Sequence, residues 1–169
     1  MSVAAVQLMT AEEFEALPDD GIERDLIRGE LRERTTMTRR NRSHARIECR
    51  VAHLLNLWLD GCPDLALEAY SGEVGCVLRR EPDTTVGVDV VVASYELERT
   101  AEDAGTTLLA GAPVLAVEIL SPYDIQKDID EKIALYLECG VALVWVINPK
   151  FETVDVYRPD AAPERFNVD

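Results

Sequence analysis

The chain of 169 residues predicts an α/β fold with a mixed central sheet between helices. Three observations predict it. Residues 112–149 read as strand, helix and strand, and residues 44–60 have the apolar spacing of an amphipathic helix. Several short segments rich in β-branched residues, with Gly, Pro or Asp between them, read as further strands. The order helix, strands, helix, strands therefore indicates helices packed on a sheet.

The N-terminal part of the chain predicts a short helix followed by a pair of strands. Thr10 followed by Glu13 is a capping-box signature, so a helix is expected over residues 10–17. Residues 23–34 contain two short mixed segments around Gly29, which predicts two strands around a turn.

Apolar periodicity predicts two longer helices. In residues 44–60 apolar side chains recur every three or four positions, which indicates one buried face. These side chains are Ile47, Val51, Leu54, Leu55 and Trp58. A second helix is expected over residues 124–138, with Gly140 as its C-cap. Later strands are expected at residues 65–69, 73–79, 86–92, 113–120, 141–147 and 154–157.

Two of these apolar strands each carry one acid, Asp89 in the first and Glu118 in the second. A buried carboxylate costs several kcal/mol unless it is paired or binds a metal. Each acid taken alone fits a solvent-facing position on an edge strand equally well. Together with the polar helix face of Asp128 and Lys132, one turn apart, they indicate a functional site. Hard cations such as Mg²⁺ and Mn²⁺ prefer oxygen ligands, and the Ile119 carbonyl would be a third one.

The charge distribution bears on possible partners. The net charge of −15 argues against tight, nonspecific binding to long duplexes. Residues 24–50, however, hold nine of the 17 basic residues against four acids. This arginine-rich segment is either a solvated surface or a local patch that binds phosphates, because more distant charges are screened by salt.

Other features exclude several classes of protein. No apolar run is long enough to span a membrane, and the N-terminus lacks the basic region of a secretory signal. The four cysteines show no CxxC spacing, and neither histidine belongs to an HExxH pattern. We therefore expect a cytoplasmic protein of one domain, residues 1–169, with reduced thiols, no zinc site and no organic cofactor.

The segments VEILSP, DIDEKIALYLECGV, VWVINP and VDVYRP together resemble a bacterial family of restriction endonucleases in the PD-(D/E)XK nuclease-like superfamily. The resemblance extends over residues 10–159 and is densest over residues 113–149. It implies a restriction-endonuclease-like mixed central sheet flanked by helices. It also implies a divalent-metal-dependent endonuclease that hydrolyses phosphodiester bonds in DNA.

The resemblance places the family's catalytic residues on Asp89, Glu118 and Lys132. The superfamily's lysine normally follows the second acid by two residues, where this chain has Leu120. In this family the candidate lysine lies on the following helix, which gives Lys132. The proline that usually precedes the first acid is Val88 here.

By the same resemblance, Asp89, Glu118 and the Ile119 carbonyl would bind Mg²⁺ or Mn²⁺, and Lys132 would position the nucleophile. The resemblance and the charge pattern together predict three supporting residues and four arginines that contact DNA. They are Asp25, His44 and Asp128, and Arg39, Arg40, Arg42 and Arg46. Asp25 stands where the family has glutamate and is one methylene shorter. Asp128 would steady Lys132, or form only a surface salt bridge. His44 would touch phosphate, or only begin a helix.

Two functions from different classes remain open. One is the metal-dependent nuclease, for which a homodimer is expected because both DNA strands must be cut. The other is a catalytically inactive nuclease-like domain that binds a protein partner or dimerises. The intact Asp89, Glu118 and Lys132 favour the nuclease, whereas the acidic balance and Asp25 favour the binding module.

Overall fold

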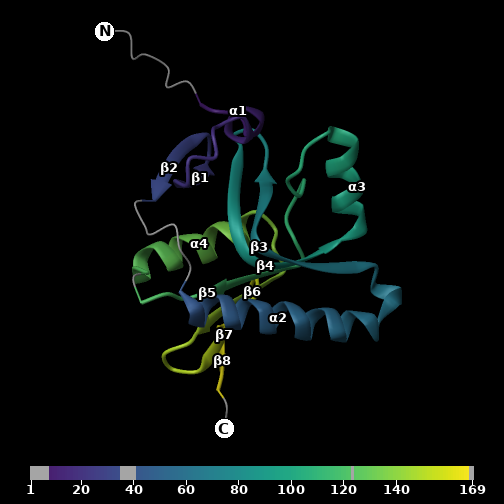
Figure 1. Ribbon diagram of the computed structural model, residues 1–169, viewed down its shortest axis with the longest axis vertical. Coiled ribbons are helices and arrows are strands. Elements are labelled where there is room, and N and C mark those ends of the chain that lie inside the picture. Colours follow the sequence, from purple (N-terminus) through teal and green to yellow (C-terminus); the bar gives the residue numbers. More distant parts are fainter. Residues whose placement is uncertain (1–7, 35–40, 123, 168–169) are drawn as a thin grey trace.

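A computed structural model of the chain describes residues 8–34, 41–122 and 124–167 (Figure 1). The helices are α1 (Ala11–Glu15), α2 (Arg42–Asp60), α3 (Tyr95–Ala104) and α4 (Gln126–Glu138), with a 3-10 turn at Pro63–Leu65. The strands are β1 (Glu23–Ile27), β2 (Glu30–Arg34), β3 (Leu67–Arg79), β4 (Thr84–Ser94), β5 (Leu115–Ile119), β6 (Leu143–Asn148), β7 (Thr153–Tyr157) and β8 (Glu164–Phe166).

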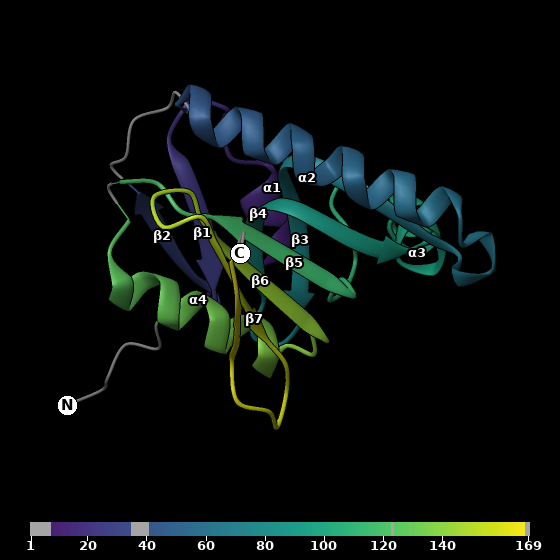
Figure 2. The same cartoon turned by 90° about the horizontal axis from the view of Figure 1, so that it is seen from below.

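All eight strands belong to one mixed sheet. The order is β2-β1-β4-β5-β6-β7-β8, and β3 pairs with β4 outside this path. Only the β5–β6 pair is parallel among the described strands, and α4 makes the crossover between them. Figure 2 shows α2 on one face of the sheet and α4 on the other. The predicted α/β fold with a mixed sheet flanked by helices is therefore confirmed.

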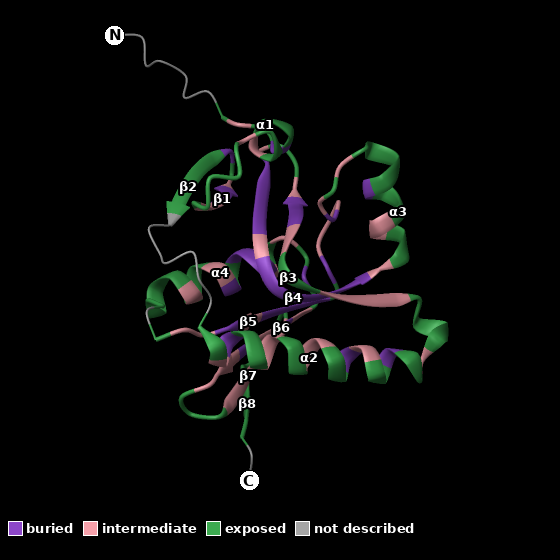
Figure 3. Ribbon diagram, in the orientation of Figure 1, coloured by how far each residue is buried: buried purple, intermediate pink, exposed green. Residues whose placement is uncertain are grey.

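Two apolar clusters fix the helices to the sheet. On the α2 face, Leu55 and Leu59 pack against β4 and β5, on residues such as Val90 and Val117. On the α4 face, Ile133 and Tyr136 pack in a cluster that extends across β3, β4, β5 and β6. Figure 3 shows that buried residues concentrate in the central strands. The acids of β4 and β5 thus lie on largely buried strands whose other side chains are mostly apolar.

Most predicted elements form within a few residues of the expected bounds. The capping box of Thr10 and Glu13 begins α1, and β1 and β2 form a hairpin around Gly29, whose φ is +79°. Helix α2 begins two residues earlier than expected, because the Asn41 side chain accepts hydrogen bonds from the backbone of Ser43 and His44.

Other predictions were wrong. The two strands expected at 65–69 and 73–79 form the single strand β3, because the intervening Gly72 and Glu73 adopt positive φ in a bulge rather than a turn. Helix α3 and strand β8 were not expected at all. Leu54 and Trp58, expected on the buried face of α2, are exposed, because the face that packs on the sheet carries Leu55 and Leu59, with Ile47, Val51 and Ala52.

The four cysteines form no disulfide among the described residues; Cys76 is buried, Cys62 and Cys139 are half-buried and Cys49 is exposed. Within the described ranges, no helix has both the length and the apolar character needed to cross a membrane.

Candidate active site

The two strand acids lie on adjacent antiparallel strands. The β4–β5 register ends with Val90 opposite Val117, and Asp89 and Glu118 are the next residue on each strand. The Asp89 carboxylate is near enough to raise the pKa of Glu118. The sheet therefore brings together two carboxylates that are 29 residues apart in the sequence.

Glu118 is bound by two side chains of α4. The Lys132 ammonium donates to Oε1 of Glu118 at 2.9 Å, and the Tyr136 hydroxyl donates to the same oxygen. Lys132 and Tyr136 lie one turn apart on the helix, so both face the sheet. Glu118 and Lys132 expose only 16% and 14% of their side chains, so this is a largely buried ion pair.

Burial raises the pKa of Glu118 above its usual value, Lys132 opposes that shift, and the nearby Asp89 raises the pKa further. Burial and the Glu118 carboxylate also raise the pKa of the Tyr136 hydroxyl well above its usual value. Tyr136 therefore stays protonated at neutral pH and acts as a hydrogen-bond donor to Glu118.

Asp89 is bound by groups of α2 and β5, whereas Glu118 is bound by α4. Its Oδ2 accepts a hydrogen bond from the Ile119 backbone N–H at 2.7 Å and lies 3.1 Å from Nε2 of His44. His44 lies in the first turn of α2 and is only 2% exposed, while Glu48 lies one turn further, 3.6 Å from Nδ1. His44 is thus placed to orient the Asp89 carboxylate.

The peptide groups of Gly87 connect this centre to β1 and α4. Its N–H lies 3.4 Å from Oδ1 of the buried Asp25, and its carbonyl accepts from Lys132 at 3.2 Å. A Cβ at position 87 would lie 2.9 Å from Oε2 of Glu73, in the β3 bulge, so the Glu73 side chain comes close to Gly87. Asp25 and Glu73 thus add two acids to the surroundings of Asp89 and Glu118.

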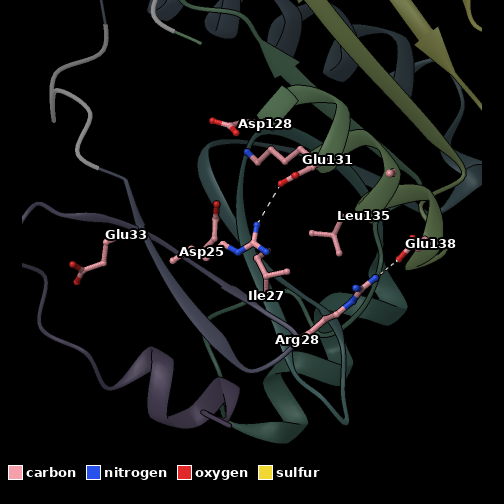
Figure 4. A pocket seen from close by; sticks show the side chains of 11 residues that line it. Asp25, Ile27, Arg28, Glu33, Asp128, Glu131, Leu135 and Glu138 are labelled. Atoms are coloured by element: carbon pink, nitrogen blue, oxygen red, sulfur yellow. Dashed lines mark hydrogen bonds and ion pairs between the residues drawn. The ribbon is translucent and has the colours of Figure 1, made fainter. Parts of the chain in front are cut away.

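A hollow of about 510 Å³ opens between the β1–β2 hairpin and α4 (Figure 4). Asp25 and Lys132 line it, so it adjoins the polar centre. Its charged lining has five acids and three bases: Asp25, Glu33, Asp128, Glu131, Glu138, Arg28, Arg32 and Lys132. Ion pairs of 3.5 Å (Arg32–Glu131) and 2.8 Å (Arg28–Glu138) cross between the hairpin and the helix. The hollow as a whole is acidic.

The structure therefore brings Asp89, Glu118, Lys132 and Asp25 together, with the Ile119 peptide beside them. Asp128 lines the hollow, one helical turn from Lys132. The Lys132 ammonium extends to the less solvated Glu118, and the supporting role of Asp128 stays a prediction.

Two of the four predicted DNA-binding arginines lie among the described residues. Arg42 and Arg46 are exposed on the first turns of α2, whereas Arg39 and Arg40 lie outside the described residues.

Two residues of the centre were missed by sequence reasoning. Tyr136 was not singled out, although its spacing of four from Lys132 is a signal that both reach one target. Glu73 had no such signal, because its approach to Gly87 depends on the positive φ of the bulge.

The chain is similar to known proteins in sequence and fold. A sequence model of the Uma2 family, described as "Putative restriction endonuclease", matches residues 11–167. The chain belongs to this family. The match covers the whole sheet, from the β1–β2 hairpin to β8, and therefore includes every residue of the polar centre.

A solved structure supports the assignment of this Uma2 member. The chain is similar to a protein of Anabaena variabilis ATCC 29413 titled a "putative nuclease belonging to DUF820", at 25% identity and a TM-score of 0.73. The alignment covers 94% of this chain and 84% of the other. No curated protein matches the chain. The fold is thus restriction-endonuclease-like.

Proposed function

We propose that the protein is an endonuclease that hydrolyses phosphodiester bonds in DNA with Mg²⁺ or Mn²⁺. The observation that carries the proposal is the buried Glu118–Lys132 pair beside Asp89 on the next strand. An ion pair of this kind is costly in an apolar sheet, and replacing such pairs by apolar residues is often neutral or stabilising. Its presence is therefore better explained by chemistry than by stability.

The residues fit a hard divalent cation. Lys132 and Tyr136 both donate to Oε1 of Glu118, so within the described residues Oε2 accepts no hydrogen bond from the chain. The described residues contain no group of three or more His, Cys, Asp or Glu side chains arranged around one point. A site here would therefore consist of Asp89, Glu118, the Ile119 carbonyl and water, and Mg²⁺ characteristically retains several waters.

Charge also favours a cation. Asp25 and Glu73 lie beside Gly87, Asp89 is two residues further along β4, and burial already raises the pKa of Glu118. A DNA phosphate would add more negative charge to this acidic hollow. A bound divalent ion would neutralise part of that charge and lower the pKa of water.

The remaining residues would position reactants. Lys132, fixed between Glu118 and the Gly87 carbonyl, would direct its ammonium at the scissile phosphate or at the attacking water. Tyr136 would hold Glu118, and His44 with the Ile119 N–H would hold Asp89. Arg42 and Arg46, together with Arg39 and Arg40, would bind the DNA backbone beside the site.

Cleavage of supercoiled plasmid tests the proposal. The wild-type protein should nick or linearise plasmid with Mg²⁺ or Mn²⁺, and EDTA should stop it. Asp89→Asn and Glu118→Gln should each lower the initial rate by about 10³-fold or more, whereas Asp130→Asn, on the exposed side of α4, should leave it unchanged. Equal rates for all four proteins would exclude this site.

The acidic lining of the hollow keeps a second function in view, a catalytically inactive domain that binds a protein partner. It predicts no cleavage by the wild type under either metal. Failure of the wild type to cut plasmid, single strands and RNA would favour this function. The expected cytoplasmic location is common to both.

A further inference from the structure

The outer face of α2 carries an apolar patch. Leu54, Leu57 and Trp58 expose 54%, 61% and 56% of their surface, and they occupy positions i, i+3 and i+4 of one helix. Residues at these spacings are neighbours on a helix surface. The patch is therefore continuous, unlike the singly scattered apolar residues that any surface has, and such patches mark contact sites.

The charges that flank the patch oppose the helix macrodipole. Arg42 lies in the first turn of α2 and Arg50 in its N-terminal half, while Asp60 ends the helix. The first turn has no acid and the last turn has no base. Because the macrodipole favours the reverse placement, these charges weaken the isolated helix. Neither Arg50 nor Asp60 forms an ion pair with any described residue, so neither charge stabilises the helix within one chain.

We propose that this face binds the same face of a second copy of the chain, with the two α2 helices antiparallel across a two-fold axis. An axis at the level of Leu55 places Arg50 of each copy opposite Asp60 of the other, because both lie five residues from it. The charged pairs would then lie about 7.5 Å along the helix on either side of the axis. Leu54, Leu57 and Trp58 would pack between them.

The charges and the macrodipole of α2 support a second copy as the partner. In a two-fold contact one surface patch is used twice, so the patch must be complementary to itself. The basic N-terminal half and the acidic end of α2 meet this condition only when the helices are antiparallel. The antiparallel arrangement also opposes the two macrodipoles favourably. His44 and Arg42 lie away from the axis, so the contact leaves the proposed active site accessible.

The size of the contact sets its expected strength. A helix of 19 residues is about 28 Å long, so two of them bury less than the roughly 800 Å² per partner of a standard interface. The dimer should therefore dissociate on dilution, with a Kd of about 1–100 µM. The inference does not depend on nuclease activity.

Sedimentation equilibrium over about 1–200 µM tests the interface. The wild type should shift from monomer to dimer, and Leu57→Asp should remain monomeric. Arg50→Glu and Asp60→Arg should each weaken association by about tenfold or more, because each places like charges opposite one another. The double variant should return to about the wild-type Kd. Arg99→Glu, on the exposed face of α3, is the matched control.

Three results would overturn the interface: a monomer at every concentration, a dimer that Leu57→Asp leaves intact, or charge reversals that the double variant does not rescue. Circular dichroism melting of each variant separates these results from misfolding. Equal Kd values for all proteins, with weaker DNA binding by Arg50→Glu, would assign Arg50 to DNA and also exclude the dimer contact.

Discussion

Helices α2 and α4 cover opposite faces of one sheet but differ in where they place polar side chains (Figure 2). Helix α4 sends Lys132 and Tyr136 inward to Glu118. Its outer acids, such as Glu131 and Glu138, form ion pairs with the β1–β2 hairpin. The polar residues of α4 therefore have partners on both sides.

Helix α2 has the opposite arrangement. Its inward polar contact to the sheet is His44 in the first turn, and Leu55 and Leu59 further along are purely apolar. Its outer face carries large apolar side chains, such as Leu57, and charges such as Arg50 and Asp60 that form no ion pair with another described residue. The comparison teaches that buried polar groups point to chemistry on α4, while exposed apolar groups point to a contact on α2.

The largest expected effect concerns the two lysines of α4. Lys132→Met should lower the cleavage rate by about 10²–10³-fold, because it removes the cation beside Glu118. Lys127→Met, on the same helix but 81% exposed, should leave the rate unchanged. Initial rates of plasmid nicking measure both. Similar rates for the two variants would remove Lys132 from the mechanism.

Substitutions on the two faces of α2 should differ in their effect on the free energy of unfolding. Leu55→Ala should lower the free energy of unfolding by about 2–5 kcal/mol, because Leu55 packs on β4 and β5. Leu57→Ala should change it by no more than about 0.5 kcal/mol in the monomer. Urea unfolding at low protein concentration compares them. A cost for Leu57→Ala equal to that of Leu55→Ala would show that the outer face already packs within one chain.

The Tyr136 hydroxyl should contribute to stability through Glu118. Tyr136→Phe removes a hydrogen bond to a carboxylate and should cost about 1.5–3 kcal/mol. Tyr157→Phe is the matched control, since the Tyr157 hydroxyl makes no hydrogen bond in the described part of the chain. Guanidinium unfolding in EDTA measures both. The same small change in the two variants would mean that Tyr136 acts only as an apolar core residue.

Glu118 should make stability depend on pH in the metal-free protein. Because burial raises its pKa in the folded state, the native protein binds the proton more tightly than the unfolded chain. Its contribution is therefore fully present below the unfolded pKa of about 4.3 and is lost as pH rises through the folded pKa. Between pH 4 and pH 8, roughly, the wild type should lose more stability than Glu118→Gln. Parallel curves of unfolding free energy against pH for the wild type and Glu118→Gln would contradict the raised pKa of Glu118.

The smallest expected effect is a difference in alkylation rate between two thiols, Cys76 of β3 and Cys49 of α2. Burial raises the pKa of Cys76, in the core on the α4 face, to about 12, so it should resist alkylation in the native protein. Cys49, exposed on α2, should react readily, and Cys49→Ser should abolish that fast reaction. Iodoacetamide labelling followed by mass spectrometry checks both. Fast labelling of Cys76 would show that the core opens frequently.

Local sequence signals predicted much of the fold. The capping box of Thr10, the turn at Gly29 and the periodicity of α2 and α4 depend on residues close in sequence, so these elements formed as expected. The continuity of β3 did not follow, because a bulge and a turn at Gly72 have the same local composition. Strand β8 pairs at the sheet edge through tertiary contacts and had no pattern of its own.

The candidate site was predictable only in part. An acid in an apolar strand signals a site, so Asp89 and Glu118 stood out, and the family resemblance added Lys132. Their proximity depends on the β4–β5 register, which the sequence does not specify. The burial of His44 and the closeness of Glu73 to Gly87 likewise result from tertiary packing.

Calorimetric titration with Mn²⁺ tests most directly whether Asp89 and Glu118 form one cation site. The wild type and Asp130→Asn should bind Mn²⁺ with equal affinity, and Asp89→Asn and Glu118→Gln should each bind at least about tenfold more weakly, since each removes an anionic ligand. Equal binding by all four proteins would contradict the account, because the cation would then lie elsewhere on the chain.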